Sequence, residues 1–233
     1  ELTPLAKKPV VASIFGGTPE EFATVAGWFA GKVAGFELNL SCPHAEGYGA
    51  AIGTDPALVE ACTRAVSKSG VPTWVKLTPN VTDIALMGKT AEEAGADAIS
   101  AINTVLGLIG VNIDTFEPLP SVDGKSTFGG MSGPGMKPIG MRCVAQLAQA
   151  TNIPVSGIGG ITNWRDAVEY LLVGAHNVQV CTAVMWRGYR LIHDFVDGFT
   201  NYLSDKGFSS TNDVIGKTLP RLTAWSKLNK GWE

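Results

Sequence analysis

The sequence has no long hydrophobic run and no cluster of basic residues. Its longest apolar stretches are broken within ten residues by glycine or a charged residue, so none is long enough to span a membrane. No basic segment followed by an apolar one marks a signal peptide. The formal net charge is −3, whereas nucleic acid or an anionic membrane would require a basic surface. We therefore expect a cytoplasmic protein that binds neither nucleic acid nor membrane.

Cysteine and histidine are also scarce. The 233 residues include four cysteines and three histidines, and neither set has the spacing of a disulfide framework or a metal site. No C-x-x-C pair is present that would hold an iron–sulfur cluster. We expect reduced thiols and no metal. Cys62 and Cys143 lie on the apolar sides of expected helices, as small buried hydrophobic residues do.

What the chain does contain is an alternation of short apolar runs with helical patterns. The runs are almost continuously apolar, as strands buried on both faces of a parallel sheet are. Thr18 and Asp55, each followed by proline, have the form of helix N-caps. The repeated β/α pattern predicts an α/β protein with a parallel sheet. Its expected strands are residues 10–16, 36–41, 73–78, 98–103, 154–160 and 177–183.

Two architectures have this pattern: an open doubly wound sheet and a TIM (β/α)8 barrel. Polar residues and glycines follow nearly every expected strand, and a barrel gathers such strand ends around one mouth. We therefore favour the barrel, with the whole of residues 1–233 forming one barrel domain. Six strands do not close an eight-stranded barrel, so one or two β/α units are expected to precede Glu1.

One connection is much longer than the others. Residues 105–137 contain clustered glycines and no clear helical pattern, whereas an ordinary connection of this kind has about two to six residues. We interpret this segment as an active-site insertion that covers the mouth of the barrel. After the last expected strand, residues 189–203 have the pattern of an amphipathic helix that Gly207 ends.

Two reactive side chains stand at expected strand ends. Cys42 follows a strand, lies between a serine and a proline, and leads into a glycine-containing loop, which favours a proton-transfer role over simple burial. Lys76 interrupts an apolar strand, where its charge is costly unless it meets an anion or is neutralised. It is a candidate for a Schiff-base lysine or for a charge beside a cofactor that becomes anionic on reduction.

Glycine-rich stretches and asparagines complete the candidate site. Residues 129–135 and 156–161 are rich in glycine, and bare backbone N–H groups at such places in a barrel bind phosphate. Asn39, Asn103 and Thr104 also lie at strand ends, and an asparagine amide offers the donor and the acceptor that the edge of an amide or imide ring requires.

In this order and spacing, the stretches ELNLSCPH, VKLTPNVTDI, AINTV, GGMSG, PVSGIGGI and VQVCTA resemble the FMN barrel of the class 1 dihydroorotate dehydrogenase superfamily. Within it they look most like the FMN domain of dihydropyrimidine dehydrogenase of the bacterial NAD-dependent type. The resemblance implies that Cys42 is the general acid or base. It further implies pyrimidine contacts from Asn39, Ser41, Asn103 and Thr104, and FMN contacts from Lys76, Ser132, Gly133, Gly157, Gly159, Gly160, Cys181 and Thr182.

The expected reaction interconverts uracil or thymine with its 5,6-dihydro form, with a hydride passing through FMN and a proton through Cys42. The Asn103–Thr104 pair favours this reaction, because dihydroorotate dehydrogenases more often resemble Asn-Ser there. Oxidation of dihydroorotate to orotate is the alternative; an aldolase-like enzyme and a non-catalytic scaffold subunit are the rivals. Iron–sulfur clusters and NAD(P) would come only from missing segments or a partner subunit. We expect a homo-oligomer, an electron-transfer partner subunit, or both.

Overall fold

A computed structural model describes residues 8–41 and 52–228. Its centre is a six-stranded sheet in the order β1-β2-β3-β4-β9-β10, in which every neighbouring pair is parallel. The strands are β1 Val11–Ile14, β2 Gly35–Asn39, β3 Thr73–Leu77, β4 Ala98–Ala101, β9 Val155–Ile158 and β10 Asn177–Gln179. All six expected strands are therefore confirmed.

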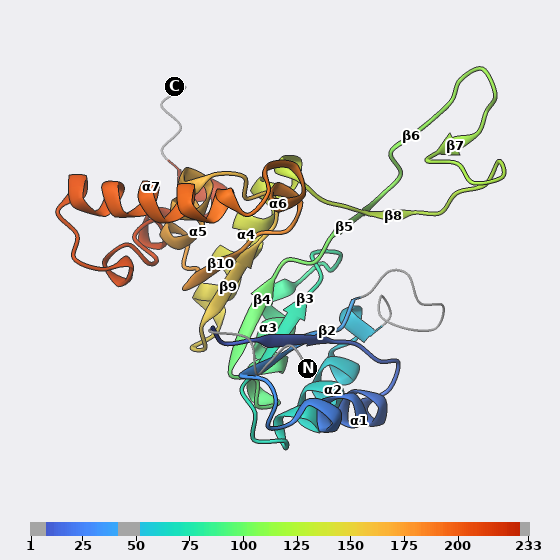
Figure 1. Cartoon of the computed structure of the whole chain (residues 1–233), viewed down its shortest axis with the longest axis horizontal. Coiled ribbons are helices and arrows are strands. Elements are labelled where there is room, and N and C mark those ends of the chain that lie inside the picture. The colour runs from blue at the N-terminus through green and yellow to red at the C-terminus, as the bar shows by residue number, and fades with distance from the viewer. Residues whose placement is uncertain (1–7, 42–51, 229–233) are drawn as a thin grey trace.

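The sheet curls, so β1 runs across the direction of β4 and β9 in Figure 1. Helices follow the strands and pack on the outer face of this curled sheet, as in part of a TIM barrel. They are α1 Pro19–Phe29, α2 Pro56–Ser67, α3 Ile84–Glu93, α4 Lys137–Ala150, α5 Trp164–Leu172, α6 Thr182–Arg187 and α7 Arg190–Lys206. Within the described residues, β1 and β10 each pair with one neighbour only, which leaves the partial barrel open between them.

The helices begin at the residues that the caps predict. The Thr18 side chain accepts a hydrogen bond from the backbone N–H of Glu21, and Asp55 accepts one from Ala57. The Glu21 carboxylate accepts from the Gly17 N–H instead of completing a capping box with Thr18. Gly207 ends α7 in the left-handed conformation, as expected.

Successive side chains of each strand point to opposite faces of the sheet, and the two faces differ chemically. Phe36 and Leu38 on β2 and Val75 and Leu77 on β3 are fully buried on the helix side. The residues between them belong to the opposite, inner face, where β2 carries Glu37. The apolar core therefore lies between sheet and helices, and the inner face is polar.

The strands end earlier than the sequence pattern predicts. The largest difference is at β10, which ends at Gln179, because the chain turns at Cys181 and Thr182 already belongs to α6. A run of apolar residues does not distinguish the end of a buried strand from the start of a buried helix. After α7, short 3-10 turns at Thr211–Asp213, Leu219–Arg221 and Trp225–Lys227 complete the described chain.

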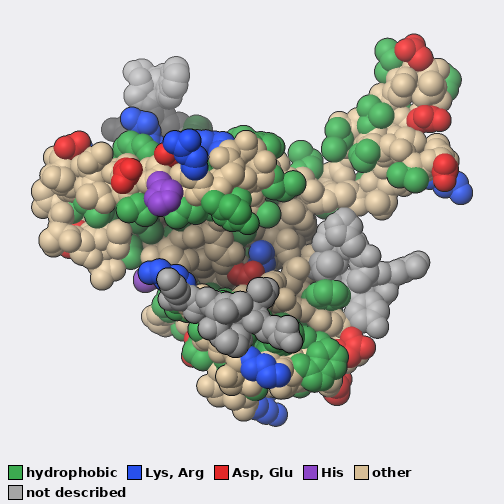
Figure 2. All heavy atoms as spheres, in the orientation of Figure 1, with side chains coloured by type: hydrophobic (Ala, Val, Ile, Leu, Met, Phe, Trp, Pro, Cys, Tyr) green, Lys and Arg blue, Asp and Glu red, His purple; other side chains and the backbone are tan. Residues whose placement is uncertain are grey.

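The long insertion forms an extended arm. Two short antiparallel pairs build it: β5 Val105–Gly107 with β8 Gly129–Met131, and β6 Gly110–Val111 with β7 Pro118–Leu119. The arm projects away from the sheet, and Figure 2 shows apolar side chains along it. Only its C-terminal end, through the 3-10 turn η3 Pro134–Met136, returns to the barrel mouth. The gating role of this segment stays a prediction.

Candidate active site

A cavity of about 260 Å³ lies where the strands β3, β4, β9 and β10 end. A single water needs only about 10–15 Å³, so this cavity has room for an organic ligand. Figure 2 shows the same face hollowed, with acidic and basic side-chain atoms visible near its centre. Nine of the expected site residues line the cavity: Lys76, Asn103, Thr104, Ser132, Gly133, Gly159, Gly160, Cys181 and Thr182.

Asn103 joins the two asparagine-bearing strand ends. Its side-chain amide donates hydrogen bonds to Asn39 Oδ1 at 2.6 Å and to Ser41 Oγ at 2.8 Å. Its Oδ1 accepts from the backbone N–H of Thr104 at 2.9 Å. These bonds fix the orientation of the amide. Three of the four polar residues expected to contact substrate are thus joined by side-chain hydrogen bonds, although Asn39 and Ser41 do not line the cavity themselves. Cys42 follows Ser41 in the sequence and lies outside the described residues.

Lys76 meets the anion that its position in an apolar strand requires. Its Nζ lies 3.1 Å from Glu37 Oε1, and both side chains are largely buried. The other carboxylate oxygen accepts from Ser100 Oγ at 2.8 Å and from Gln179 Nε2 at 2.7 Å. A Schiff-base lysine must be a free amine, and an ammonium paired with a buried carboxylate does not favour that reading.

Two glycine loops meet backbone to backbone at the far side of the cavity. Gly133, Gly159 and Gly160 all have positive φ, at 94°, 126° and 73°. A Cβ on Gly160 would lie 2.6 Å from the backbone nitrogen of Lys137, so only glycine fits there. Close by, Thr182 Oγ1 donates to Ser132 Oγ at 3.1 Å. Glycine loops and hydroxyls suit an anion such as a phosphate group.

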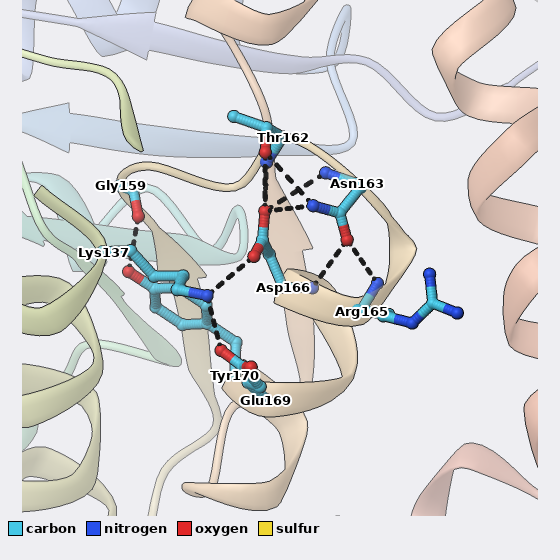
Figure 3. Close-up of polar contacts among 8 residues, drawn as sticks. All are labelled: Lys137, Gly159, Thr162, Asn163, Arg165, Asp166, Glu169 and Tyr170. Atoms are coloured by element: carbon cyan, nitrogen blue, oxygen red, sulfur yellow. Dashed lines mark hydrogen bonds and ion pairs between the residues drawn. The ribbon is translucent and has the colours of Figure 1, made fainter. Parts of the chain in front are cut away.

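An ion-pair cluster ties these two loops together (Figure 3). Lys137, at the start of α4, contacts Asp166 Oδ1 at 2.8 Å and Glu169 Oε2 at 2.7 Å on α5. Asp166 Oδ2 accepts from the N–H and hydroxyl of Thr162, at 2.8 and 2.7 Å, and from the Asn163 side-chain amide at 2.9 Å.

The protonation equilibria reflect these contacts. Hydrogen bonds to Asp166 and Glu169 raise the pKa of Lys137. Burial opposes ionisation of Asp166, but the hydrogen bonds from Lys137 and Thr162 outweigh it and hold the pKa of the carboxyl below its usual range. Both groups are therefore charged near neutral pH.

Gly157 differs from the other expected glycines, because it does not line the cavity. A Cβ there would lie 2.5 Å from the ring of Tyr170, so this glycine makes room for an aromatic side chain under β9. The Tyr170 hydroxyl donates to the carbonyl of Gly159 at 2.7 Å, and burial raises the pKa of this phenol. Gly157 thus affects the cavity only indirectly, by making room for Tyr170, which hydrogen-bonds the loop at Gly159.

The three described cysteines differ in burial, and the two that were expected to be buried are buried. Cys62 and Cys143 are fully buried, and burial raises the pKa of both, that of Cys62 to about 11. Cys181 is exposed and lines the cavity. Among the described residues, no group of three His, Cys, Asp or Glu side chains is placed to hold a metal. No helix in residues 8–41 and 52–228 is long and apolar enough to cross a bilayer.

Comparison with known proteins identifies the family of this chain. The family model described as dihydroorotate dehydrogenase matches residues 3–203. The chain belongs to the dihydroorotate dehydrogenase family. Its relatives include the dihydroorotate dehydrogenase B (NAD(+)) catalytic subunits of Pyrococcus horikoshii, Thermococcus kodakarensis and Methanosarcina mazei, at 51%, 49% and 50% identity. These matches cover 91%, 91% and 89% of this chain and 68%, 68% and 65% of the respective relatives.

Membership in the dihydroorotate dehydrogenase family confirms the superfamily and the oxidoreductase class expected from the sequence motifs. It does not support the finer expectation of closeness to dihydropyrimidine dehydrogenase, and it favours the alternative. The Asn103–Thr104 pair was the only residue feature that discriminated the two reactions, and one dipeptide carries little information.

Several site residues were missed by sequence reasoning. They are Glu37, Ser100, Ser156 and Gln179 on the inner face, and Lys137 with Asp166 behind the glycine loops. A signal was available for the first group, because a glutamate and a glutamine inside apolar strands must each find partners. For the second group, the spacing of Asn163 and Asp166 is that of a capping box, but nothing local predicts the ion pair of Asp166 with Lys137.

Proposed function

We propose that this chain is the catalytic part of a dihydroorotate dehydrogenase of the B type, which oxidises dihydroorotate to orotate with FMN. The observation that carries the proposal is one cavity that brings together an oriented asparagine, a lysine and a glycine cradle. The names of the most similar relatives support the same substrate.

The residues present fit FMN. The backbone of Gly133, Gly159 and Gly160, with the hydroxyls of Ser132 and Thr182, would hold the phosphate, because glycines add no side chain of their own beside the loop N–H groups. Lys76 would lie beside the pyrimidine edge of the ring system. When bound, FMN supplies the acceptor for a hydride.

The chain's own residues would bind the substrate and move the proton. The pre-oriented Asn103 amide, supported by Asn39 and Ser41, would hydrogen-bond the amide edge of dihydroorotate. Cys42 would remove the proton from C5 while the hydride leaves C6, so that the two C–H bonds break and the C5=C6 bond forms.

The electrons would leave the site through a partner subunit. The relatives are named as catalytic subunits of NAD(+)-dependent enzymes, which implies that another subunit completes each of those enzymes. No iron–sulfur ligand pattern occurs in this sequence. We therefore propose that a partner passes the electrons on to NAD+.

An anaerobic titration of the native, flavin-loaded protein tests the substrate. Dihydroorotate should bleach the flavin absorbance and yield one orotate per flavin, whereas dihydrouracil should leave the spectrum unchanged. Bleaching by dihydrouracil alone would instead assign the dihydropyrimidine reaction. Absence of flavin from the native protein, after reconstitution with FMN as well, would refute both and favour the scaffold reading.

A further inference from the structure

Glu37 is an acidic residue in the interior of the partial barrel, and the proposed mechanism does not use it. It stands in the middle of β2, and only 8% of its surface is exposed. Interiors of such barrels are commonly filled by bulky branched apolar residues. An ionised carboxylate is costly there unless charged or polar donors compensate it, so its presence requires an explanation.

Donors from three other strands converge on this carboxylate. Lys76 on β3 meets Oε1 at 3.1 Å, while Ser100 on β4 and Gln179 on β10 meet Oε2 at 2.8 and 2.7 Å. Gln179 also contacts Ser156 Oγ on β9, at 3.1 Å. The carboxylate thus fixes the position of the Lys76 ammonium, and the remaining donors fix the carboxylate.

The network links two sides of the inner face. Lys76 and Gln179 line the 260 Å³ cavity of the proposed FMN site. Glu37 does not line that cavity; with Gln179 it lines a second cavity of about 290 Å³, which lies toward the N-terminal ends of the strands. Glu37 therefore acts on a ligand in the first cavity by holding Lys76 and Gln179 and, through space, by its charge.

We propose that Glu37 is a positioning residue that holds Lys76 at the flavin and sets how much positive charge the FMN ring experiences. This inference rests on the proposed function, because it requires FMN beside Lys76. Reduction adds negative charge to the pyrimidine edge of FMN, which a nearby ammonium stabilises and a nearby carboxylate opposes. Glu37 therefore keeps the flavin potential lower than Lys76 alone would.

The potential of the bound flavin tests the proposal directly. Glu37→Gln retains the shape of the side chain and removes its charge, so the equilibrium constant for two-electron reduction should rise by at least about tenfold, or about 30 mV. Lys76→Met should shift the potential in the opposite direction. Glu37→Asp, which retains the charge, should stay closer to the wild type than Glu37→Gln does.

A matched control and a second variant complete the test. Glu60→Gln removes an equally negative side chain from a surface ion pair with Arg64 on α2, and should leave the potential unchanged. If Glu37→Gln does not fold, Ser100→Ala removes one donor to the carboxylate, leaves its negative charge less compensated, and should lower the potential.

The outcomes separate this inference from the proposed function. A wild-type protein that binds no FMN would refute the proposed function. A wild type that binds FMN, with a potential that Glu37→Gln leaves unchanged or lowers, would refute the proposed effect of the Glu37 charge and leave the proposed function standing. With an unfolded Glu37→Gln variant, a potential that Ser100→Ala leaves unchanged or raises would refute it equally.

Discussion

Replacing Asp166 with asparagine should loosen the junction between the two glycine loops while leaving the cavity walls intact. Asp166 is 7% exposed and bridges Lys137, which follows one loop at the start of α4, to Thr162 and Asn163, which follow the other loop. The substitution is isosteric, so it removes charge and acceptor strength without creating a cavity.

The size of the effect follows from the contacts that remain. Breaking a fully buried ion pair by removing one partner costs about 3–5 kcal/mol. The Lys137 side chain is 27% exposed and keeps Glu169 at 2.7 Å, so we expect the free energy of unfolding to fall by about 2 kcal/mol. Glu60→Gln, at an exposed ion pair, should cost at most about 0.5 kcal/mol.

Ligand binding gives the second readout for Asp166→Asn. If the ion pair of Asp166 with Lys137 keeps the two glycine loops in the position that binds the phosphate, the FMN affinity of the variant should fall about tenfold, or about 1.4 kcal/mol. Affinity for riboflavin, which has no phosphate, should not change. Equal losses for the two flavins, measured by fluorescence titration, would refute the cradle role and leave only a general structural one.

The pH dependence of stability adds a third readout. The pKa of Asp166 is lowered in the folded protein from the ordinary value of 3.8. Its contribution is therefore present above that value and is lost as pH falls through the folded pKa. The pKa of Lys137 is raised from 10.5, so its contribution is present below that value and is lost as pH rises through the folded pKa. The difference between wild type and variant should be constant between these limits and shrink outside them; denaturant titrations at several pH values measure it.

Two further substitutions test the site, each with a control. Gly160 has a positive φ, and Gly160→Ala places a Cβ 2.6 Å from a backbone nitrogen, so this variant should bind FMN at least about tenfold more weakly. The control Gly135→Ala, whose Cβ meets nothing within 4 Å, should bind FMN as the wild type does. Equal FMN affinities of the two variants in a flavin titration would contradict the close approach at Gly160. Cys42→Ala should retain flavin and lose turnover by roughly 100- to 10,000-fold, whereas Cys143→Ala should lose stability and keep turnover; near wild-type turnover of Cys42→Ala would exclude it as the acid or base.

Much of the fold could be predicted because its signals are local. Continuous apolar runs identified all six strands, and the caps at Thr18 and Asp55 identified two helix starts. The strands of the arm are two or three residues long, too short to show alternation, so no pattern predicted them.

The candidate site also has one part that local motifs predict and one part that depends on residues distant in sequence. Glycine loops and strand-end asparagines are visible as short motifs, and the structure gathers most of them around one cavity. The partners of Glu37 are distant in sequence, since Lys76 is 39 and Gln179 is 142 residues away. Which strand faces which across a curled sheet decides that pairing, and a single sequence does not contain it.

The Glu37 carboxylate, which three donors share, also limits which substitutions this sequence can accept during evolution. Replacing Glu37 by an apolar residue would remove the acceptor that Lys76 and Ser100 use, at a cost of about 1–3 kcal/mol for each group, and would leave Gln179 only the hydroxyls of Ser100 and Ser156 as acceptors. Loss of the carboxylate at position 37 is therefore expected to be accompanied by changes at the positions of its donors. In a set of homologous sequences, these positions should vary together or not at all.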